Sequence, residues 1–221
     1  MSFIFLSHLI CKETPGYGGK TIFQLKNIKA IKSGDFCNTQ EWIFGNHIGT
    51  HIDLPRHFFE NGFTVDQMKA EDWVSSNPIL IDRPAMADEL IDLQELQDQI
   101  SRDADFIMIR TGFEKWRSKD DDVYWKNNPG LVPELGVWLR ENRPNVRFVG
   151  FDFISMTAFQ KREIGRMAHK AFLNPVPQGK PILIVEDMHL DQVQSALKRI
   201  IISPVRILDA DASPVTIWAE F

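Results

Sequence analysis

Apolar side chains occur along this chain in short runs rich in Ile, Val and Phe, and Gly, Pro, Asn and Asp stand between the runs. Such runs are typical of β-strands connected by turns. The pattern predicts strands over Phe3–Leu9, Thr21–Ile31, Trp42–Asp53, Pro78–Asp82, Asp105–Arg110, Val146–Phe153, Ile182–Glu186, Arg199–Ile207 and Val215–Ala219.

Three segments instead repeat their apolar side chains at the spacing of an α-helix. Asp92–Ile100 begins with a good capping residue, Pro133–Asn142 begins with a proline suited to the first turn, and Arg162–Phe172 has an apolar side. These helices alternate with strands in the middle of the chain, and both ends are rich in strands. The order predicts an α/β fold with a mixed sheet. The polar stretch Lys115–Gly130 is expected to be a long surface loop.

Composition indicates an ordinary globular protein. The 221 residues are 43% hydrophobic and 25% charged, which suffices for a substantial core, and we expect one domain over residues 1–221. The net charge of -5 is mildly acidic and no Lys/Arg stripe stands out, which argues against a nucleic-acid partner. No window approaches the roughly 18 apolar residues that would span a bilayer, so no membrane association is expected.

Two cysteines, Cys11 and Cys37, occur in the chain. Such a low number is typical of free thiols in a reducing compartment. The apolar N-terminus lacks the basic region and cleavage site of a signal peptide. We therefore expect a cytoplasmic protein.

The segment His47–His57, with the sequence HIGTHIDLPRH, contains three of the six histidines of the chain. His47, His51, Asp53 and His57 are separated by even numbers of residues, so in an extended segment they would point to one face. On an α-helix, Asp53 and His57 would lie well round the cylinder from His47. The run therefore predicts an extended segment and not the helical zinc motif of metalloproteases.

A straight strand would keep the two nearest histidines apart. Four residues of strand span about 13 Å, too far for two imidazoles to reach one ion at about 2 Å. The chain is therefore expected to bend between His47 and His51, and Gly49 is the residue that permits it. Pro55 is expected to end the strand pairing.

The residue types in this run suit a metal. Two imidazoles and one carboxylate favour Zn²⁺, Mn²⁺ or Fe²⁺ over Ca²⁺, and three protein ligands leave a position for water. His57 follows the proline, where it could stand beside the ion and move protons without ligating it. The alternative is that these histidines only form hydrogen bonds at a strand end. Three histidines and an aspartate in one short run favour the metal site.

The same run resembles the signature of the metal-dependent cyclase-like hydrolases, a family that includes bacterial kynurenine formamidases and isatin hydrolases. Their HxGTHxDxPxH pattern is matched at every fixed position. Weaker similarities continue along nearly the whole chain, in FLSHLICKETPGYGG, IRTGF, GFDFIS, VEDM and DASPVTIWA.

This resemblance implies a swivelling β/β/α fold, a homodimer or homotetramer, and hydrolysis of an amide-type bond with one or two Zn²⁺ or Mn²⁺ ions per subunit. By position in the family pattern, His47, His51 and Asp53 resemble the ligands of the first metal. His57 resembles the catalytic acid or base.

Two distant residues also match the family pattern. Glu186 resembles the carboxylate that completes the site, and His169 resembles a histidine that joins it where a second metal binds. By themselves, a carboxylate at a strand end could be solvated and a helix histidine could simply be packed. Asp152 and Ser155 are expected to cap a helix or shape the pocket, without a catalytic role. The first loop reads TPGYGG instead of the usual tryptophan–proline–glycine–aspartate, so the wall that contacts the substrate is expected to differ.

The sequence therefore predicts a metal-dependent hydrolase of an N-formyl or related aryl amide, with N-formylkynurenine as the leading substrate. One alternative is ring opening of a cyclic amide or lactone such as isatin, or the reverse cyclisation. Another is a metal- or ligand-binding module without catalysis. Aromatic residues near the signature could line a pocket for an aryl ring, although each one is individually more typical of a core: Trp42, Phe44, Phe58, Phe59 and Trp73.

Overall fold

The structure is a computed structural model that describes residues 2–19, 23–176 and 179–221. Its strands are β1 (Phe3–Phe5), β2 (Phe23–Lys29), β3 (Thr39–Phe44), β4 (His51–Asp53), β5 (Val74–Ser75), β6 (Pro78–Asp82), β7 (Leu90–Ile91), β8 (Phe106–Arg110), β9 (Gly130–Leu131), β10 (Phe148–Phe151), β11 (Leu183–Glu186), β12 (Arg199–Pro204) and β13 (Ala212–Glu220). Its α-helices are α1 (Asp121–Lys126), α2 (Pro133–Asn142) and α3 (Arg162–Leu173).

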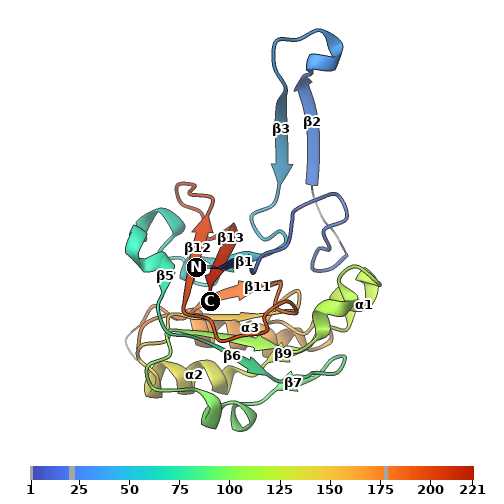
Figure 1. The fold of residues 1–221 in the computed structure, drawn as a ribbon. Coiled ribbons are helices and arrows are strands. Elements are labelled where there is room, and N and C mark those ends of the chain that lie inside the picture. The colour runs from blue at the N-terminus through green and yellow to red at the C-terminus, as the bar shows by residue number, and fades with distance from the viewer. Residues whose placement is uncertain (1, 20–22, 177–178) are drawn as a thin grey trace.

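Nine of the strands in the described residues form one mixed sheet with the order β5-β12-β13-β4-β11-β10-β8-β6, and β1 pairs with β13 (Figure 1). Strands β6, β8, β10 and β11 are parallel to their neighbours in that group. Strand β4 is antiparallel to both β11 and β13 and so joins the parallel part to the antiparallel part. The short strand β4 therefore lies at the centre of the sheet.

Within the parallel part, strands β8, β10 and β11 are buried on both faces. Strand β8, with the sequence FIMIR, is a continuous apolar run whose first four side chains are buried, as expected for a covered parallel strand. Helices α2 and α3 pack against each other and cover this part of the sheet (Figure 1). Phe172 and Leu173 of α3 are fully buried. Each such side chain contributes about 1.5–3 kcal/mol of hydrophobic stabilisation.

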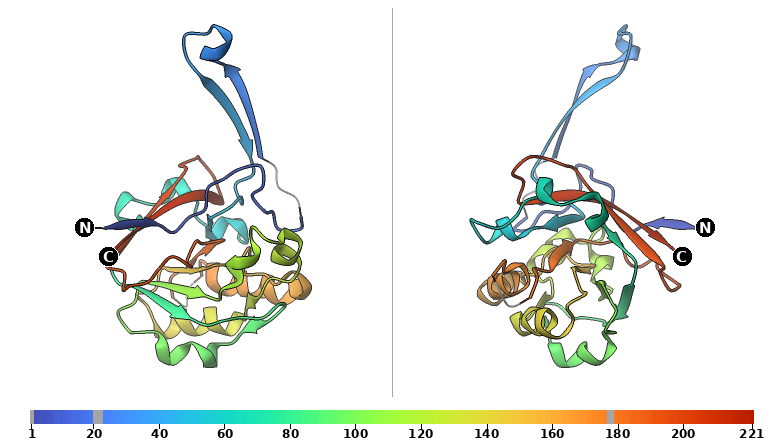
Figure 2. Two further views of the ribbon diagram at one scale, coloured as in Figure 1. Left: turned by 45° about the vertical axis from the view of Figure 1, so that its right-hand side comes forward. Right: turned by 90° about the vertical axis from the view of Figure 1, so that its left-hand side faces the viewer.

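Strands β2 and β3 form a hairpin that projects from the rest of the molecule (Figures 1 and 2). Most of its side chains are exposed, including the indole of Trp42, which is 64% exposed. Leu25 and Ile43 of the same hairpin are also exposed. An isolated two-stranded ribbon is at best marginally stable in water.

The predicted mixed α/β fold is confirmed, and several element bounds are close to those expected. Strand β6 and helix α2 coincide with Pro78–Asp82 and Pro133–Asn142, and α3 extends one residue beyond its prediction. Thr21 and Ile22 of one predicted strand lie outside the described residues.

The prediction of one strand over Trp42–Asp53 is wrong. Its two ends belong to β3 and β4, which lie in different sheets, and the chain turns between them. Gly49 lies in this connection with a φ of 58°, in the left-handed region that favours glycine. The bend expected at Gly49 is therefore present, and it separates two strands.

The prediction of a helix over Asp92–Ile100 is also wrong. This segment forms two short 3-10 turns, Leu93–Glu95 and Gln97–Gln99, divided at Leu96, whose φ is −112°. Leu96 is fully buried. A segment this short gains little from helix formation alone, so the packing of Leu96 decides its backbone.

The prediction of a long surface loop over Lys115–Gly130 is wrong as well. Helix α1 lies within it, and the side chain of Asp120 accepts a hydrogen bond from Val123 N at the N-terminus of that helix. Tyr124 is fully buried and donates a hydrogen bond to Asp187, 2.5 Å away. This buried contact orders a segment whose composition is that of a solvated loop.

Cys11 and Cys37 are free, as predicted, and both are exposed. None of the helices in the described ranges has the length and apolar character needed to cross a membrane.

Candidate metal centre

The run His47–His57 places its polar side chains in one pocket through two local features. His51 and Asp53 lie on β4 with the buried Ile52 between them, so both polar side chains point to the same face of the sheet. His47 reaches this face from the turn before Gly49. Strand pairing ends before Pro55, as predicted, because a 3-10 turn over Pro55–His57 begins there.

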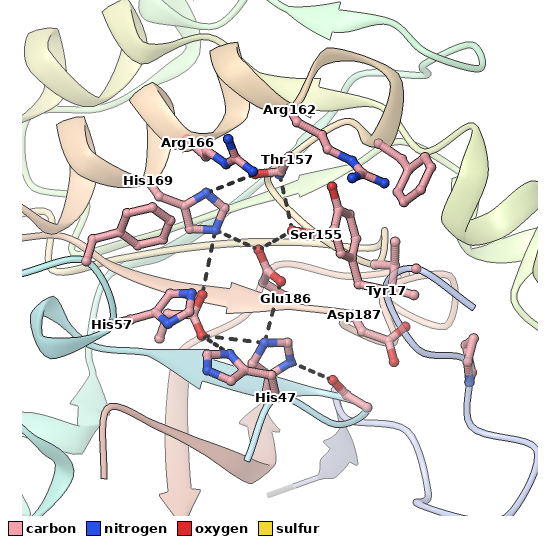
Figure 3. Close-up of a pocket in the computed structure, with 18 residues that line it drawn as sticks. Tyr17, His47, His57, Ser155, Thr157, Arg162, Arg166, His169, Glu186 and Asp187 are labelled. Carbon is pink, nitrogen blue, oxygen red and sulfur yellow. Dashed lines mark hydrogen bonds and ion pairs between the residues drawn. The ribbon is translucent and has the colours of Figure 1, made fainter. Parts of the chain in front are cut away.

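Three side chains of this run converge (Figure 3). His47 Nδ1 lies 2.9 Å from Asp53 Oδ1, and His51 Nε2 lies 3.5 Å from the same oxygen. One nitrogen or oxygen atom from each residue falls within 4.8 Å of the others. The structure thus brings together the three residues predicted as ligands of a first metal.

The two distant residues reach the same place from other elements. Glu186 ends β11 and lies directly opposite His51 in the antiparallel pairing of β11 with β4. His169 Nε2, from α3, lies 3.4 Å from Glu186 Oε1 and 3.7 Å from Asp53 Oδ2. Asp53, His169 and Glu186 form a second buried triad, and Asp53 belongs to both.

Close packing of α3 positions His169. A Cβ atom at Gly165 would lie 2.4 Å from Thr157 Oγ1, so a larger residue would push the helix away. His169 Nδ1 lies 2.9 Å from Gly165 O, to which it can donate, and 3.2 Å from Thr157 Oγ1. In the same way, His51 Nδ1 lies 2.9 Å from the carbonyl oxygen of Gly49. These contacts direct the Nε2 atoms of both rings into the pocket, as in known metal sites.

Glu186 is held by the loop that follows β10. Its Oε1 accepts hydrogen bonds from Met156 N at 2.7 Å and from Ser155 Oγ at 3.1 Å. Ser155 thus shapes the pocket, as expected. Asp152 accepts hydrogen bonds from the backbone N–H groups of Thr111 and Gly112 and stabilises that neighbouring loop.

The residues present fit a divalent cation. His51 Nε2 is buried and has no hydrogen-bond partner in the described part of the chain. Leaving such an atom unpaired costs about 1–3 kcal/mol, whereas a metal ion would satisfy it. Burial alone would raise the pKa of Asp53, but the positive charge of His47 and its hydrogen bond hold that pKa well below its usual range. Asp53 is therefore ionised at neutral pH, the state that a metal ligand requires.

His57 stands beside these triads and is held by a residue that sequence reasoning missed. Its Nδ1 lies 3.1 Å from Asp211 Oδ2, and His47 Nε2 lies 3.4 Å from the same oxygen. Asn46 donates a hydrogen bond of 2.7 Å to the other oxygen of Asp211. Asp211 begins the DASPVTIWA segment, far from the histidine run in sequence. Only the pairing of β13 with β4 makes them neighbours.

Charge and burial have opposite effects on the pKa values of His57 and Asp211. Burial lowers the pKa of His57 below its ordinary value, although the carboxylates of Asp53 and Asp211 oppose that shift. The hydrogen bond from His47 lowers the pKa of Asp211, which is therefore ionised at neutral pH. A carboxylate only accepts hydrogen bonds, so the Nδ1 of His57 carries the proton and its Nε2 is free to accept one.

The aromatic residues near the signature lie in different surroundings, and one of them lines the pocket. Phe58 lines the pocket and stacks on His169 with ring centroids 4.9 Å apart. Trp73 is a core residue, whereas Trp42 is exposed on the hairpin. Phe44 and Phe59 are partly buried and do not line this pocket.

The pocket that contains both triads has a volume of about 460 Å³. Opposite β4 it is bounded by the loop after β10 and by α3, and the first loop contributes Tyr17 (Figure 3). Helix α3 contributes Arg162 and Arg166. A second His/Glu cluster, His8–Glu114–His189, lies outside this pocket.

Comparison with known proteins gives the family of this chain. The profile of the Cyclase family, described as "Putative cyclase", matches residues 4–158. Cyclase-like protein 1 of Arabidopsis thaliana is 27% identical over 220 residues, which cover 95% of this chain and 81% of that protein. Kynurenine formamidase of Erythrobacter litoralis (strain HTCC2594) is 25% identical over 207 residues, covering 94% of this chain and 88% of that protein.

Solved structures show that the fold is shared. Isatin hydrolase A from Labrenzia aggregata superposes with a TM-score of 0.78 at 23% identity, covering 99% of this chain and 93% of that one. An isatin hydrolase bound to the product analogue thioisatinate gives a TM-score of 0.80 at 18% identity, covering 98% and 91%. The fold that the resemblance implied is therefore confirmed.

Proposed function

The chain belongs to the Cyclase family, and on this basis we propose that it is a metal-dependent hydrolase of aryl amides. The observation that carries the proposal is the pair of adjoining triads that share Asp53. His47, His51 and Asp53 would hold a first divalent ion, and Asp53, His169 and Glu186 a second. Imidazole and carboxylate ligands suit Zn²⁺ and Mn²⁺.

A divalent ion in this site supplies a Lewis acid for the carbonyl oxygen and lowers the pKa of a water molecule toward neutrality. The chain supplies the remaining parts of the reaction. Asp53 and Glu186 provide two negative charges that compensate the ion, and the backbone and hydroxyl donors around Glu186 fix its orientation. Phe58 covers one side of His169 and excludes water from it.

His57 moves the proton. Its free Nε2 accepts a proton as water adds to the amide carbonyl, and it then gives that proton to the departing nitrogen. The C–N bond breaks, and the products are an amine and a carboxylic acid. Asp211 holds the ring in the required tautomer through Nδ1. General acid–base catalysis of this kind typically contributes 10²–10⁴ in rate.

For the substrate we propose an N-formyl aryl amide, with N-formylkynurenine as the leading candidate. The kynurenine formamidase relative supports this choice because its similarity extends over 94% of the chain. The isatin hydrolases share the fold at lower identity, so a cyclic amide is the competing substrate. The position of His57 next to both triads supports a catalytic site over a module that only binds metal.

The test is a hydrolysis assay of the purified protein loaded with Zn²⁺ or Mn²⁺. N-formylkynurenine and isatin are offered separately, and the amine or ring-opened product is followed by absorbance. Metal-dependent release of kynurenine at a higher kcat/KM than isatin opening supports the formamidase. Faster opening of isatin would indicate that cyclic amides, and not formyl amides, are the substrates. A protein that binds metal stoichiometrically and hydrolyses neither compound would refute the hydrolase.

We also propose that the protein is a homodimer or homotetramer in which the β2–β3 hairpin contacts another copy. The exposed apolar side chains of Leu25, Trp42 and Ile43, on a ribbon that packs on little else, support this. Light scattering of the separated protein measures the mass. Trp42→Glu is expected to weaken the assembly, whereas Thr39→Glu on the same strand is the control. A monomeric wild-type protein at micromolar concentration would refute it.

A further inference from the structure

One wall of the pocket carries two arginines without acidic partners. Arg162 and Arg166 both line the pocket, and neither forms an ion pair within the described ranges of the chain (Figure 3). Arginine side chains inside a binding pocket attract anions, and their planar guanidinium groups bind carboxylates with paired hydrogen bonds.

Arg162 is held in a defined position by aromatic side chains. Its guanidinium carbon lies 3.9 Å from the centre of the Phe159 ring, a cation–π contact. Tyr17 packs edge-on against the same ring with centroids 5.5 Å apart. The wall is therefore built from the first loop and from the start of α3. This first loop is the segment whose sequence departs from that of formamidases.

Helix geometry places the arginines in line with the candidate metal ligands. Arg162, Arg166 and His169 are separated by four and three residues, so they share one face of α3. At a rise of about 1.5 Å per residue, Arg166 lies about 4.5 Å and Arg162 about 10.5 Å from His169 along the helix axis. An anion bound between the arginines would thus lie several ångströms from the triads.

The charges in the pocket leave these arginines uncompensated. The carboxylate of Asp187 already pairs with Arg117, with an N–O distance of 2.8 Å. Asp53 and Glu186 would balance the charge of one divalent ion, and a second ion would add further positive charge. The two arginines then remain as positive charges in a chain whose net charge is -5, so they form a local site that draws anionic ligands into the pocket.

We propose that Arg162 and Arg166 bind a carboxylate of the substrate, so that the enzyme prefers aryl amides that carry a carboxylate over those that lack one. The carboxylate would lie about 5–10 Å from the scissile bond, as helix geometry sets the spacing. The reaction named here rests on the proposed function, whereas the binding of an anion does not. N-formylkynurenine carries such a carboxylate, and isatin does not.

The test measures binding by calorimetry on the zinc-loaded protein, with kynurenine and its methyl ester as matched probes that differ by one charge. The wild-type protein is expected to bind the acid at least tenfold more tightly than the ester. Arg162→Gln and Arg166→Gln should each weaken binding of the acid about tenfold and leave the ester unchanged. Arg166→Lys should keep part of the preference. Lys170→Gln, which removes an exposed charge from the same helix, should keep all of it.

Three outcomes would overturn the proposal: no binding of the acid, equal affinity for acid and ester, or equal losses for both probes in the arginine variants. The experiment separates failure of the anion-site proposal from failure of the proposed hydrolase function. A protein that prefers the acid but cleaves no amide would support the anion site and refute the hydrolase function. A protein that hydrolyses N-formylkynurenine and its methyl ester with the same kcat/KM would support the hydrolase function and refute the anion site.

Discussion

Replacing Asp211 with Asn would test how the imidazole of His57, the proposed proton carrier, is positioned. The substitution keeps the size of the side chain and leaves an oxygen that can remain bonded to Asn46, but it removes the charge beside His57. It also provides an amide donor, which permits the wrong tautomer of His57. We expect Asp211→Asn to lower kcat while the protein stays folded.

The expected decrease in kcat follows from the hydrogen bond between His57 and Asp211. A hydrogen bond to a charged group contributes about 1.5–3 kcal/mol. The side chains of His57 and Asp211 are 29% and 33% exposed, so solvent screening favours the lower part of that range. A loss of about 1.5–2 kcal/mol corresponds to roughly a 10–30-fold decrease in kcat.

The assay is steady-state hydrolysis at saturating metal, because Asp211 also contacts His47 and its loss could weaken metal binding. Metal content is measured on the same samples. The pH profile gives a second readout. The Asp211 carboxylate stabilises the protonated form of His57, so its removal lowers the pKa of His57. Activity that requires neutral His57 is lost as pH falls through that pKa, and the acid limb of the variant should therefore move to lower pH.

Asp209→Asn is the matched control, since Asp209 is exposed in the same loop and the change in charge is the same. It should leave kcat and the pH profile unchanged. An Asp211→Asn enzyme with wild-type kcat and an unshifted acid limb, at full metal occupancy, would refute the positioning of His57 by this carboxylate.

The remaining predictions concern the ligands, the proton carrier and the buried contact behind the pocket. His51→Ala should lose bound metal and activity together, as measured by elemental analysis and turnover; full metal content would remove His51 from the ligand set. His57→Gln should retain most of the metal while kcat falls by about 10²–10⁴, and an unchanged kcat would exclude His57 from proton transfer. Tyr124→Phe should lower the free energy of unfolding in urea by about 1–3 kcal/mol, because the buried carboxylate of Asp187 loses a donor. Equal midpoints for the wild type and this variant would show that the hydroxyl adds no stability.

Much of the candidate site could be predicted from one short segment because its geometry is local. The even spacing of His51 and Asp53 sets them on one face of any extended chain, and Gly49 permits the turn that returns His47 to that face. These consequences of backbone geometry hold in any surroundings. The strand and helix predictions succeeded for the same reason where the apolar pattern was long, as in α2 and α3.

Local pattern misled where packing decided the backbone. Leu96 and Tyr124 are both fully buried, yet the first interrupts a predicted helix and the second orders a predicted loop. The hydrophobic run that includes Trp42 and His51 looked like one strand, although its ends serve different sheets. Propensity is a weak guide when a single buried side chain can outweigh it.

By itself, the sequence determined which residue types the His47–His57 run brings to the candidate site, the bend at Gly49 and the mixed α/β fold. Only the tertiary structure decided which distant groups meet these candidate ligands. The pairing of β4 with β11 and β13 brings Glu186 and Asp211 to the histidines, and the close approach of α3 at Gly165 adds His169. Arg162 and Arg166 have the pattern of a solvated helix face in sequence, and their place in the pocket follows from how α3 packs. Neighbours across a sheet or along a packed helix are set by pairing and packing, which residue spacing along the chain does not encode.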